Sequence, residues 1–214
     1  MKVIKLIFVN FLFIVLFVGV FESIFGYWFK KNNFGIYIRD QRNIKKNFEV
    51  EHNNQKYEYI FERNSLGFVG KEVSSKDIKI VFEGGSTGEQ MFLPPQFGIV
   101  NLINSFFKKD NLNYKIFNAS RAGKTLRGYH NDFVYWFPRI DDFKPEIFIF
   151  YTGINDSLLN YPKHWDEPKR NNKIEKLEDF LKNNSVIYEL KVKFSNKFLK
   201  QIRLKYNLEN KSLY

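Results

Sequence analysis

The chain has 214 residues, enough for one domain of ordinary size and an appendage. It contains no cysteine, which excludes disulfides, zinc-thiolate sites and thiol nucleophiles. The net charge of +11 would suit nucleic acid or anionic lipid. However, the basic residues are spread along the chain and Phe dominates the aromatic residues, so we expect no nucleic-acid partner.

The first apolar segment has the length and the flanks of a membrane anchor. Residues 3–25 are long enough for a spanning helix, which needs roughly 20 mostly apolar residues. Lys2 and Lys5 lie at its start, and Tyr27 and Trp28 follow at interfacial spacing. An uncleaved signal-anchor is favoured over a cleaved signal peptide, because no small-x-small cleavage site follows the apolar run. A buried helix of a soluble protein is the third alternative.

The short basic leader favours a cytoplasmic N-terminus, although basic residues flank both ends of the segment. We therefore predict a single-pass membrane protein whose residues 30–214 lie on the extracytoplasmic side, periplasmic or extracellular. Residues 1–29 form the predicted anchor. Residues 30–56 are polar and rich in Asn and Lys, and we interpret them as a linker. An α/β domain is predicted over residues 57–214.

Short apolar runs alternate with helical patterns in this domain. Runs rich in β-branched and aromatic residues predict strands at residues 57–62, 78–82, 114–117 and 146–151. Helices are predicted after the Pro94-Pro95 pair and over residues 125–137, 173–182 and 186–205. The apolar side of the first helix is expected to contain Phe97, Val100, Leu102, Ile103 and Phe106. Buried strands that alternate with helices predict a parallel sheet.

Three loops that follow predicted strands carry unusual residues. They are Glu83-Gly84-Gly85-Ser86-Thr87, residues 118–125, and Thr152-Gly153-Ile154-Asn155-Asp156. In open parallel sheets, ligands bind just beyond the carboxyl ends of the strands. A serine after two glycines can sit on a tight turn with its hydroxyl exposed. The alternatives are a Gly/Ser turn without chemistry in the first loop and a helix N-cap at Asn155 or Asp156 in the third.

The second loop also resembles the phosphate-binding pattern Gly-x-x-x-x-Gly-Lys-Thr. Asn118 stands in place of the first glycine, on which the backbone geometry of that pattern depends. The next strong strand is followed by Thr152-Gly153 and not by an aspartate that could bind magnesium. Nucleotide binding is therefore the weaker interpretation of this loop.

Taken together, the three loops resemble the successive blocks of the SGNH (GDSL-like) hydrolase family. Gly84-Gly85-Ser86-Thr87 resembles the first block of its membrane-anchored members, and residues 118–123 and 153–156 resemble the second and third. Residues 64–70 also resemble a stretch found in those anchored members. The resemblance covers residues 60–160. It implies a flavodoxin-like three-layer α/β/α fold, with a parallel sheet that we expect to be incomplete.

The resemblance also implies a chemistry. Ser86 would be the nucleophile of a serine esterase, and the oxyanion donors would be its own N–H, the Gly123 N–H and the Asn155 side-chain amide. The implied substrate is an ester of an envelope carbohydrate or lipid, and the chemistry requires no cofactor and no metal. Glu83 departs from the small or apolar residue expected before the glycines, and either perturbs the charge of the site or faces solvent.

The family's last block, Asp-x-x-His, does not occur in the sequence. His52 lies in the predicted linker and His130 in a predicted helix, whereas His164 follows the third block and could serve as a substitute base or substrate contact. We favour a truncated reading frame over a degenerate family member. The alternative functions are a non-catalytic, membrane-anchored envelope protein that keeps the fold, and a basic membrane-surface protein whose motifs are accidental.

Overall fold

The computed structural model describes residues 2–30, 33–52, 54–158 and 173–195. The chain divides into two compact units. One unit joins the two ends of the sequence, Met1–Gly35 and Arg170–Tyr214, and the other is the continuous stretch Ile36–Lys169.

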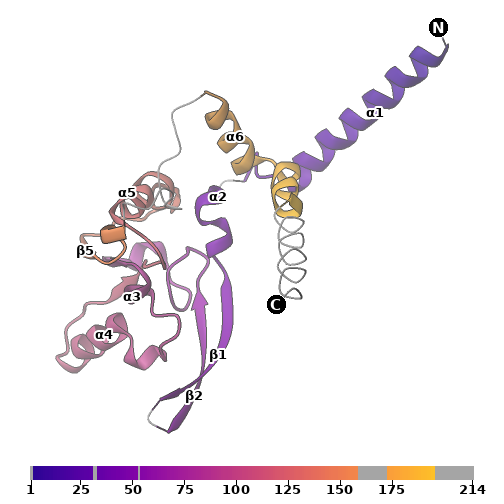
Figure 1. The fold of residues 1–214 in the computed structure, drawn as a ribbon. Helices are drawn as coiled ribbons and strands as arrows, with labels where there is room; N and C mark the ends of the chain where they lie inside the picture. Colours follow the sequence, from indigo (N-terminus) through magenta and orange to yellow (C-terminus); the bar gives the residue numbers. More distant parts are fainter. Residues whose placement is uncertain (1, 31–32, 53, 159–172, 196–214) are drawn as a thin grey trace. The chain divides into compact units, whose positions relative to one another are not determined.

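The first unit contains the apolar N-terminal segment, which forms helix α1 over Lys2–Phe25 (Figure 1). Within it, Ile4–Phe25 has a mean hydropathy of 2.7, and no residue in its most apolar part is buried. The structure thus confirms one N-terminal helix that is long and apolar enough to cross a membrane. Helix α6 covers Lys173–Asn184, and a second helical stretch at residues 186–195 follows it.

The second unit contains a parallel sheet of three strands in the order β4-β3-β5. Strand β3 covers Ile80–Gly84, β4 covers Ile116–Asn118 and β5 covers Ile147–Tyr151. Val81 in the central strand pairs with Phe117 on one side and with Phe148 on the other. The mixed α/β class and the parallel sheet predicted from the sequence are confirmed.

Helices pack on both faces of this sheet. On one face, Ile80, Phe82 and Ile116 form a core with Val100 of α4, which covers Ile99–Lys109. On the other face, Phe133 of α5 packs on Phe148 with ring centroids 4.7 Å apart. Helix α5 covers Leu126–Tyr135 and ends before Pro138, as predicted.

The apolar side predicted for α4 is partly wrong. Leu102 and Phe106 are exposed, by 43% and 61%. The residues that pack on the sheet with Val100 are Ile99, Ile103 and Phe107. Val100, Ile103 and Phe107 follow an i, i+3, i+7 spacing and therefore share one face of the helix, which begins after a 3-10 turn at Pro95–Phe97.

Strand β5 is less buried than its apolar sequence suggested. Ile147, Ile149, Phe150 and Tyr151 are all exposed by more than a third. In the part of the chain that the structure describes, β5 is an edge strand paired only with β3, and α4 makes its core with β3 and β4. Ile147, Ile149 and Tyr151, which lie on the α4 face, therefore lack the cover that a central strand has, whereas Phe150 lies on the other face and contacts Tyr129 of α5.

A two-stranded antiparallel hairpin precedes the sheet. Strand β1 covers Ile44–His52 and strand β2 covers Gln55–Arg63. Strand β1 thus lies within residues 30–56, which the sequence interpretation treated as a linker. Alternation is visible only in its second half, where Phe48 stacks on Tyr59 with ring centroids 5.6 Å apart.

The remaining elements are short. A helical turn, α2, covers Gly35–Ile38 and places the fully buried Ile38 against Gly67 and Trp136. The others are helix α3 at Ser86–Glu89 and the 3-10 turns η1 at Arg39–Gln41, η2 at Ser75–Asp77, η4 at Phe137–Arg139 and η5 at Asp156–Leu158.

Candidate active site

Ser86 stands where strand β3 turns into helix α3. It is exposed and is the first residue of the helix, directly after Gly85. The backbone carbonyl of Gly85 accepts the N–H groups of Gly88 (3.0 Å) and Glu89 (2.9 Å), which closes the turn. Among the described residues, the Ser86 hydroxyl has no hydrogen-bond partner. The expected tight turn with an outward serine is therefore present.

Two glycines around Ser86 allow the neighbouring loops to approach closely. A Cβ on Gly85 would lie 2.6 Å from Asn155 Nδ2, and a Cβ on Gly88 would lie 2.6 Å from Ser120 Oγ. Real Cβ atoms do not tolerate such distances, because they are far inside van der Waals contact. The first loop thus contacts both the second and the third.

The second loop is held against β3 by backbone hydrogen bonds. Ala119 N donates to Phe82 O (2.8 Å) and Arg121 N donates to Gly84 O (3.1 Å). The buried side chain of Asn118 donates to Gly88 O (2.8 Å). Gly123 follows in a left-handed conformation with φ +76°, which favours glycine, and Lys124 comes directly after it.

The third loop places Asn155 beside the first. Gly153 has φ +142°, a conformation that only glycine adopts readily. Asn155 Nδ2 donates to the backbone carbonyl of Lys124 (2.9 Å). Asp156 Oδ1 accepts the N–H of Leu126 (2.8 Å), the first residue of α5. The acidic side chain therefore stabilises the start of a helix from a different loop.

A pocket of about 140 Å³ lies where these loops meet. Its lining residues are Gly85, Thr87, Lys124, Tyr129 and Tyr151 with the loop at 152–155. A larger pocket of about 420 Å³ lies between β2, residues 69–73 and α4, and Ser86, Gly123 and Asn155 do not line it. The smaller pocket is the one that Asn155 lines, together with Gly85 and Thr87 on either side of Ser86, although Ser86 and Gly123 themselves do not line it.

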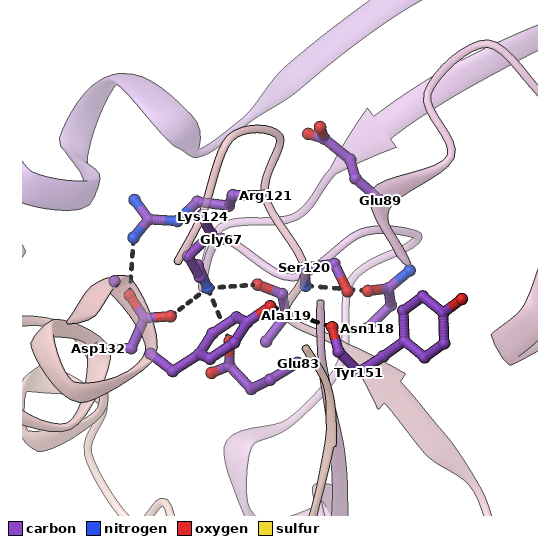
Figure 2. Close-up of polar contacts among 12 residues, drawn as sticks. Gly67, Glu83, Glu89, Asn118, Ala119, Ser120, Arg121, Lys124, Asp132 and Tyr151 are labelled. Atoms are coloured by element: carbon purple, nitrogen blue, oxygen red, sulfur yellow. Dashed lines mark hydrogen bonds and ion pairs between the residues drawn. The ribbon is translucent and has the colours of Figure 1, made fainter. Parts of the chain in front are cut away.

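A buried charge network lies beneath the three loops (Figure 2). The Lys124 ammonium donates to Glu83 Oε2 (2.7 Å), to Ala119 O (3.2 Å) and to Asp132 Oδ2. The side chains of Glu83, Lys124 and Asp132 are fully buried. Asp132 Oδ1 also accepts Arg121 Nη2 (2.7 Å). Glu83 therefore points into the interior, and the expectation that it could face solvent is wrong.

The surroundings of this network shift the pKa values of Glu83 and Tyr37. Burial raises the pKa of the Glu83 carboxyl to about 8, and the ammonium of Lys124 offsets part of that effect. Burial and the carboxylate of Asp132 raise the pKa of Tyr37, whose hydroxyl donates to Asp132 Oδ1 (2.7 Å). One oxygen of Glu83, Oε1, has no hydrogen-bond partner in the described part of the chain.

This arrangement argues against the nucleotide-binding interpretation of the second loop. A phosphate-binding lysine must present its ammonium to the ligand. The ammonium of Lys124 is instead held between Glu83 and Asp132, with no exposed side-chain surface.

A second buried ion pair ties the hairpin to the site. Arg63 Nη2 contacts Glu89 Oε1 at 2.7 Å, and both side chains are at least 95% buried. Glu89 Oε2 accepts the N–H of Ala122 (2.8 Å), and Arg63 Nη1 donates to Gly67 O (2.7 Å). Sequence reasoning missed the roles of Arg63 and of the Lys124 network. The sequence feature that could have indicated the buried network is the glutamate inside the apolar run Ile-Val-Phe-Glu-Gly.

The structure describes two of the three histidines. His52 ends strand β1, His130 lies exposed in α5, and His164 lies outside the described residues. Within the described ranges, no group of three or more His, Asp or Glu side chains could hold a metal ion.

The structure brings the predicted donors to one edge of the sheet. Asn155 contacts the turn that carries Ser86, and Gly123 immediately precedes the lysine whose carbonyl holds Asn155. Comparisons of the chain with protein-family models, curated proteins and solved structures found no match.

Proposed function

We propose that the protein is a serine acyl-ester hydrolase or acyltransferase of the SGNH type, held to a membrane by α1. The observation that carries the proposal is the contact between the Asn155 amide and Gly85, directly before the exposed Ser86. A nucleophile and an amide donor from different loops converge there, beside a small pocket. A nucleophile beside an amide donor is one part of the arrangement that ester cleavage requires, and a general base is the other.

The chemistry assigned to each group follows from the tetrahedral intermediate. Attack by Ser86 Oγ on an ester carbonyl places a negative charge on the carbonyl oxygen. An amide NH2 has two donors, and Asn155 uses one of them on Lys124 O. Its second N–H and the backbone N–H of Ser86 would stabilise that charge, and the family resemblance assigns a third donor to the Gly123 N–H. Loss of one such donor typically lowers kcat about a hundredfold or more.

The sheet supports the proposed fold family. The strand order β4-β3-β5 has the first strand of the parallel sheet at its centre, flanked by the second and the third. This is the start of the flavodoxin-like order, in which ligands bind at the carboxyl ends of the strands next to the first strand. The loops that carry Ser86 and Asn155 leave β3 and β5 at that edge.

The proposed location follows from α1. A spanning α1 with a cytoplasmic N-terminus would put the site on the extracytoplasmic side. Esters of envelope carbohydrates or lipids are the substrates accessible to an anchored enzyme there. The proposed chemistry uses no cofactor and no metal.

A non-catalytic envelope-binding protein is the second candidate. It is favoured by one observation: in the described part of the chain, no side chain hydrogen-bonds to Ser86 as a general base would. His164 is the first residue to test as a substitute base, because it follows the third loop in the sequence.

Active-site labelling of the full chain tests the proposal. Membranes from cells that produce the protein are treated with a fluorophosphonate probe, and the Ser86→Ala variant is compared with Ser105→Ala. Ser105 is an exposed serine on α4, where its hydroxyl bonds Asn101 O (2.8 Å), so it is a matched control. We expect labelling of the wild type and of Ser105→Ala, and none of Ser86→Ala.

Two results would contradict the assignment. Unchanged labelling of Ser86→Ala would show that another residue is the nucleophile. If the protein is present and no variant is labelled, the catalytic proposal fails and the binding protein takes its place.

A further inference from the structure

The helical stretch at residues 186–195, called here the 186–195 helix, is fixed to the end of α1 by hydrogen bonds. Glu22 Oε1 accepts Ser185 Oγ (2.6 Å) and Ile187 N (3.0 Å), and Glu22 Oε2 accepts Val186 N (3.2 Å). A carboxylate is favourable at this position, because the N–H groups of a helix start are unpaired and carry partial positive charge.

Further contacts join the same two parts of the chain. Tyr27 N donates to Asn184 O (2.8 Å), and Trp28 Nε1 donates to Glu22 Oε2 (2.8 Å). The Trp28 ring also packs edge-on against Phe180 of α6, with centroids 5.7 Å apart. The start of the 186–195 helix is therefore held within one turn of the point where α1 ends at Phe25.

The 186–195 helix exposes an apolar stripe. Ile187, Leu190 and Phe194 are exposed by 38%, 40% and 68%. At 3.6 residues per turn, this i, i+3, i+7 spacing confines the three side chains to an arc of about 60°. Lys191 and Lys193 lie on either side of that arc. A basic, amphipathic helix of this kind favours a membrane surface.

We propose that the 186–195 helix is an interfacial helix, which inserts Ile187, Leu190 and Phe194 into the surface of the bilayer that α1 crosses. The inference rests on the proposed membrane anchoring. Two features identify lipid as the occupant. The helix is attached at the interfacial end of an apolar helix long enough to span, next to Trp28. Lys191 beside the stripe complements anionic headgroups, and its aliphatic stem can lie along the apolar boundary, whereas Lys193 pairs with Glu189 of the same helix.

The test uses site-directed spin labels on the full chain in nanodiscs of phosphatidylglycerol and phosphatidylcholine. Because the sequence has no cysteine, each single-cysteine variant carries only one label. Leu190→Cys and Phe194→Cys report on the stripe. Ser195→Cys is the matched control, because it is exposed on the same helix about 100° away from Phe194. Val15→Cys reports on the insertion of α1.

Collision rates with oxygen, which enters the bilayer, and with a water-soluble nickel chelate give the depth of each label. We expect the labels at 190 and 194 to collide with the nickel chelate several-fold less often than the label at 195, and with oxygen more often. Equal nickel accessibility at all three positions, with the label at 15 shielded, would overturn the inference and leave the anchoring intact. A water-accessible label at 15 would overturn the anchoring itself.

A third result identifies a different occupant. If the labels at 190 and 194 are shielded from both reagents, a protein surface covers the stripe, and the lipid assignment is wrong. Circular dichroism of each labelled variant shows whether the helices remain folded.

Discussion

Replacing Lys124 with methionine removes a charge from the centre of the buried network. Methionine keeps most of the aliphatic volume but has no ammonium. The variant loses the contacts to Glu83 Oε2 (2.7 Å), to Ala119 O (3.2 Å) and to Asp132 Oδ2. Asp132 keeps Arg121 and Tyr37 as partners, whereas Glu83 loses the hydrogen bond from Lys124, and its Oε1 has no hydrogen-bond partner among the described residues. Most of the cost should therefore fall on Glu83.

The expected loss of stability follows from the burial of the pair. Removing one partner of a buried ion pair typically costs about 3–5 kcal/mol, because the other charge is left without compensation. We expect Lys124→Met to lie near 3 kcal/mol at neutral pH. The pKa of Glu83 is raised to about 8, so its carboxyl already keeps a proton at neutral pH, and the loss there lies at the lower end of this range. Above pH 8 the loss should increase.

Urea unfolding of the full chain in detergent, followed by pulse proteolysis, measures this loss. With a urea dependence of roughly 2 kcal/mol/M, a loss of about 3 kcal/mol lowers the midpoint by about 1.5 M. The second variant, Lys124→Met with Glu83→Leu, replaces both partners by apolar groups and should recover most of the stability.

Lys45→Met is the matched surface control. Lys45 is 75% exposed and its Nζ lies 3.8 Å from Glu62 Oε2. An exposed pair contributes about 0–1 kcal/mol, so this midpoint should hardly change. If Lys124→Met unfolds at the same urea concentration as Lys45→Met, the buried network does not stabilise the fold and the reasoning fails.

Three further predictions concern the same edge of the sheet. The native state keeps a proton on Glu83 that the unfolded chain releases above pH 4.5. The free energy of unfolding should therefore fall as the pH rises from about 5 to 8. Glu83→Gln should make this fall smaller in urea titrations carried out at several pH values. Gly88→Ala should cost about 1–3 kcal/mol in the urea assay, and adding Ser120→Ala should restore part of it by removing the hydroxyl 2.6 Å from the new Cβ. Gly85→Ala should displace the Asn155 amide and slow fluorophosphonate labelling about a hundredfold, and it should destabilise the fold less than Gly88→Ala, because only the end of the Asn155 side chain must move.

The parallel sheet and the positions of its loops were predictable because short apolar runs ended in glycine-rich turns. The predicted strands at 78–82, 114–117 and 146–151 correspond to β3, β4 and β5 with shifts of one or two residues. Since the carboxyl ends of parallel strands meet at one edge, the approach of Asn155 to the turn that carries Ser86 followed from the topology.

The features that the sequence did not predict depend on partners far apart in the chain. Lys124 is separated from Glu83 by 41 residues, and Arg63 from Glu89 by 26. Burial of such charges depends on their pairing, which no local pattern records. Strand β1 was missed because lysine and asparagine interrupt its alternation. The exposure of β5 was missed because a continuous apolar run does not report the strand's place in the sheet.

Lys124 connects the stability of the fold to the proposed site through two different groups. Its ammonium pairs with Glu83 and Asp132, whereas its backbone carbonyl accepts the Asn155 amide. A side-chain substitution leaves the carbonyl in place as long as the loop stays folded. Loss of labelling in a network variant therefore means loss of the loop's structure, and it must be compared with the midpoint of unfolding. Gly85→Ala displaces the Asn155 amide and leaves the buried network in place. This variant therefore separates the position of the oxyanion donor from the stability of the fold.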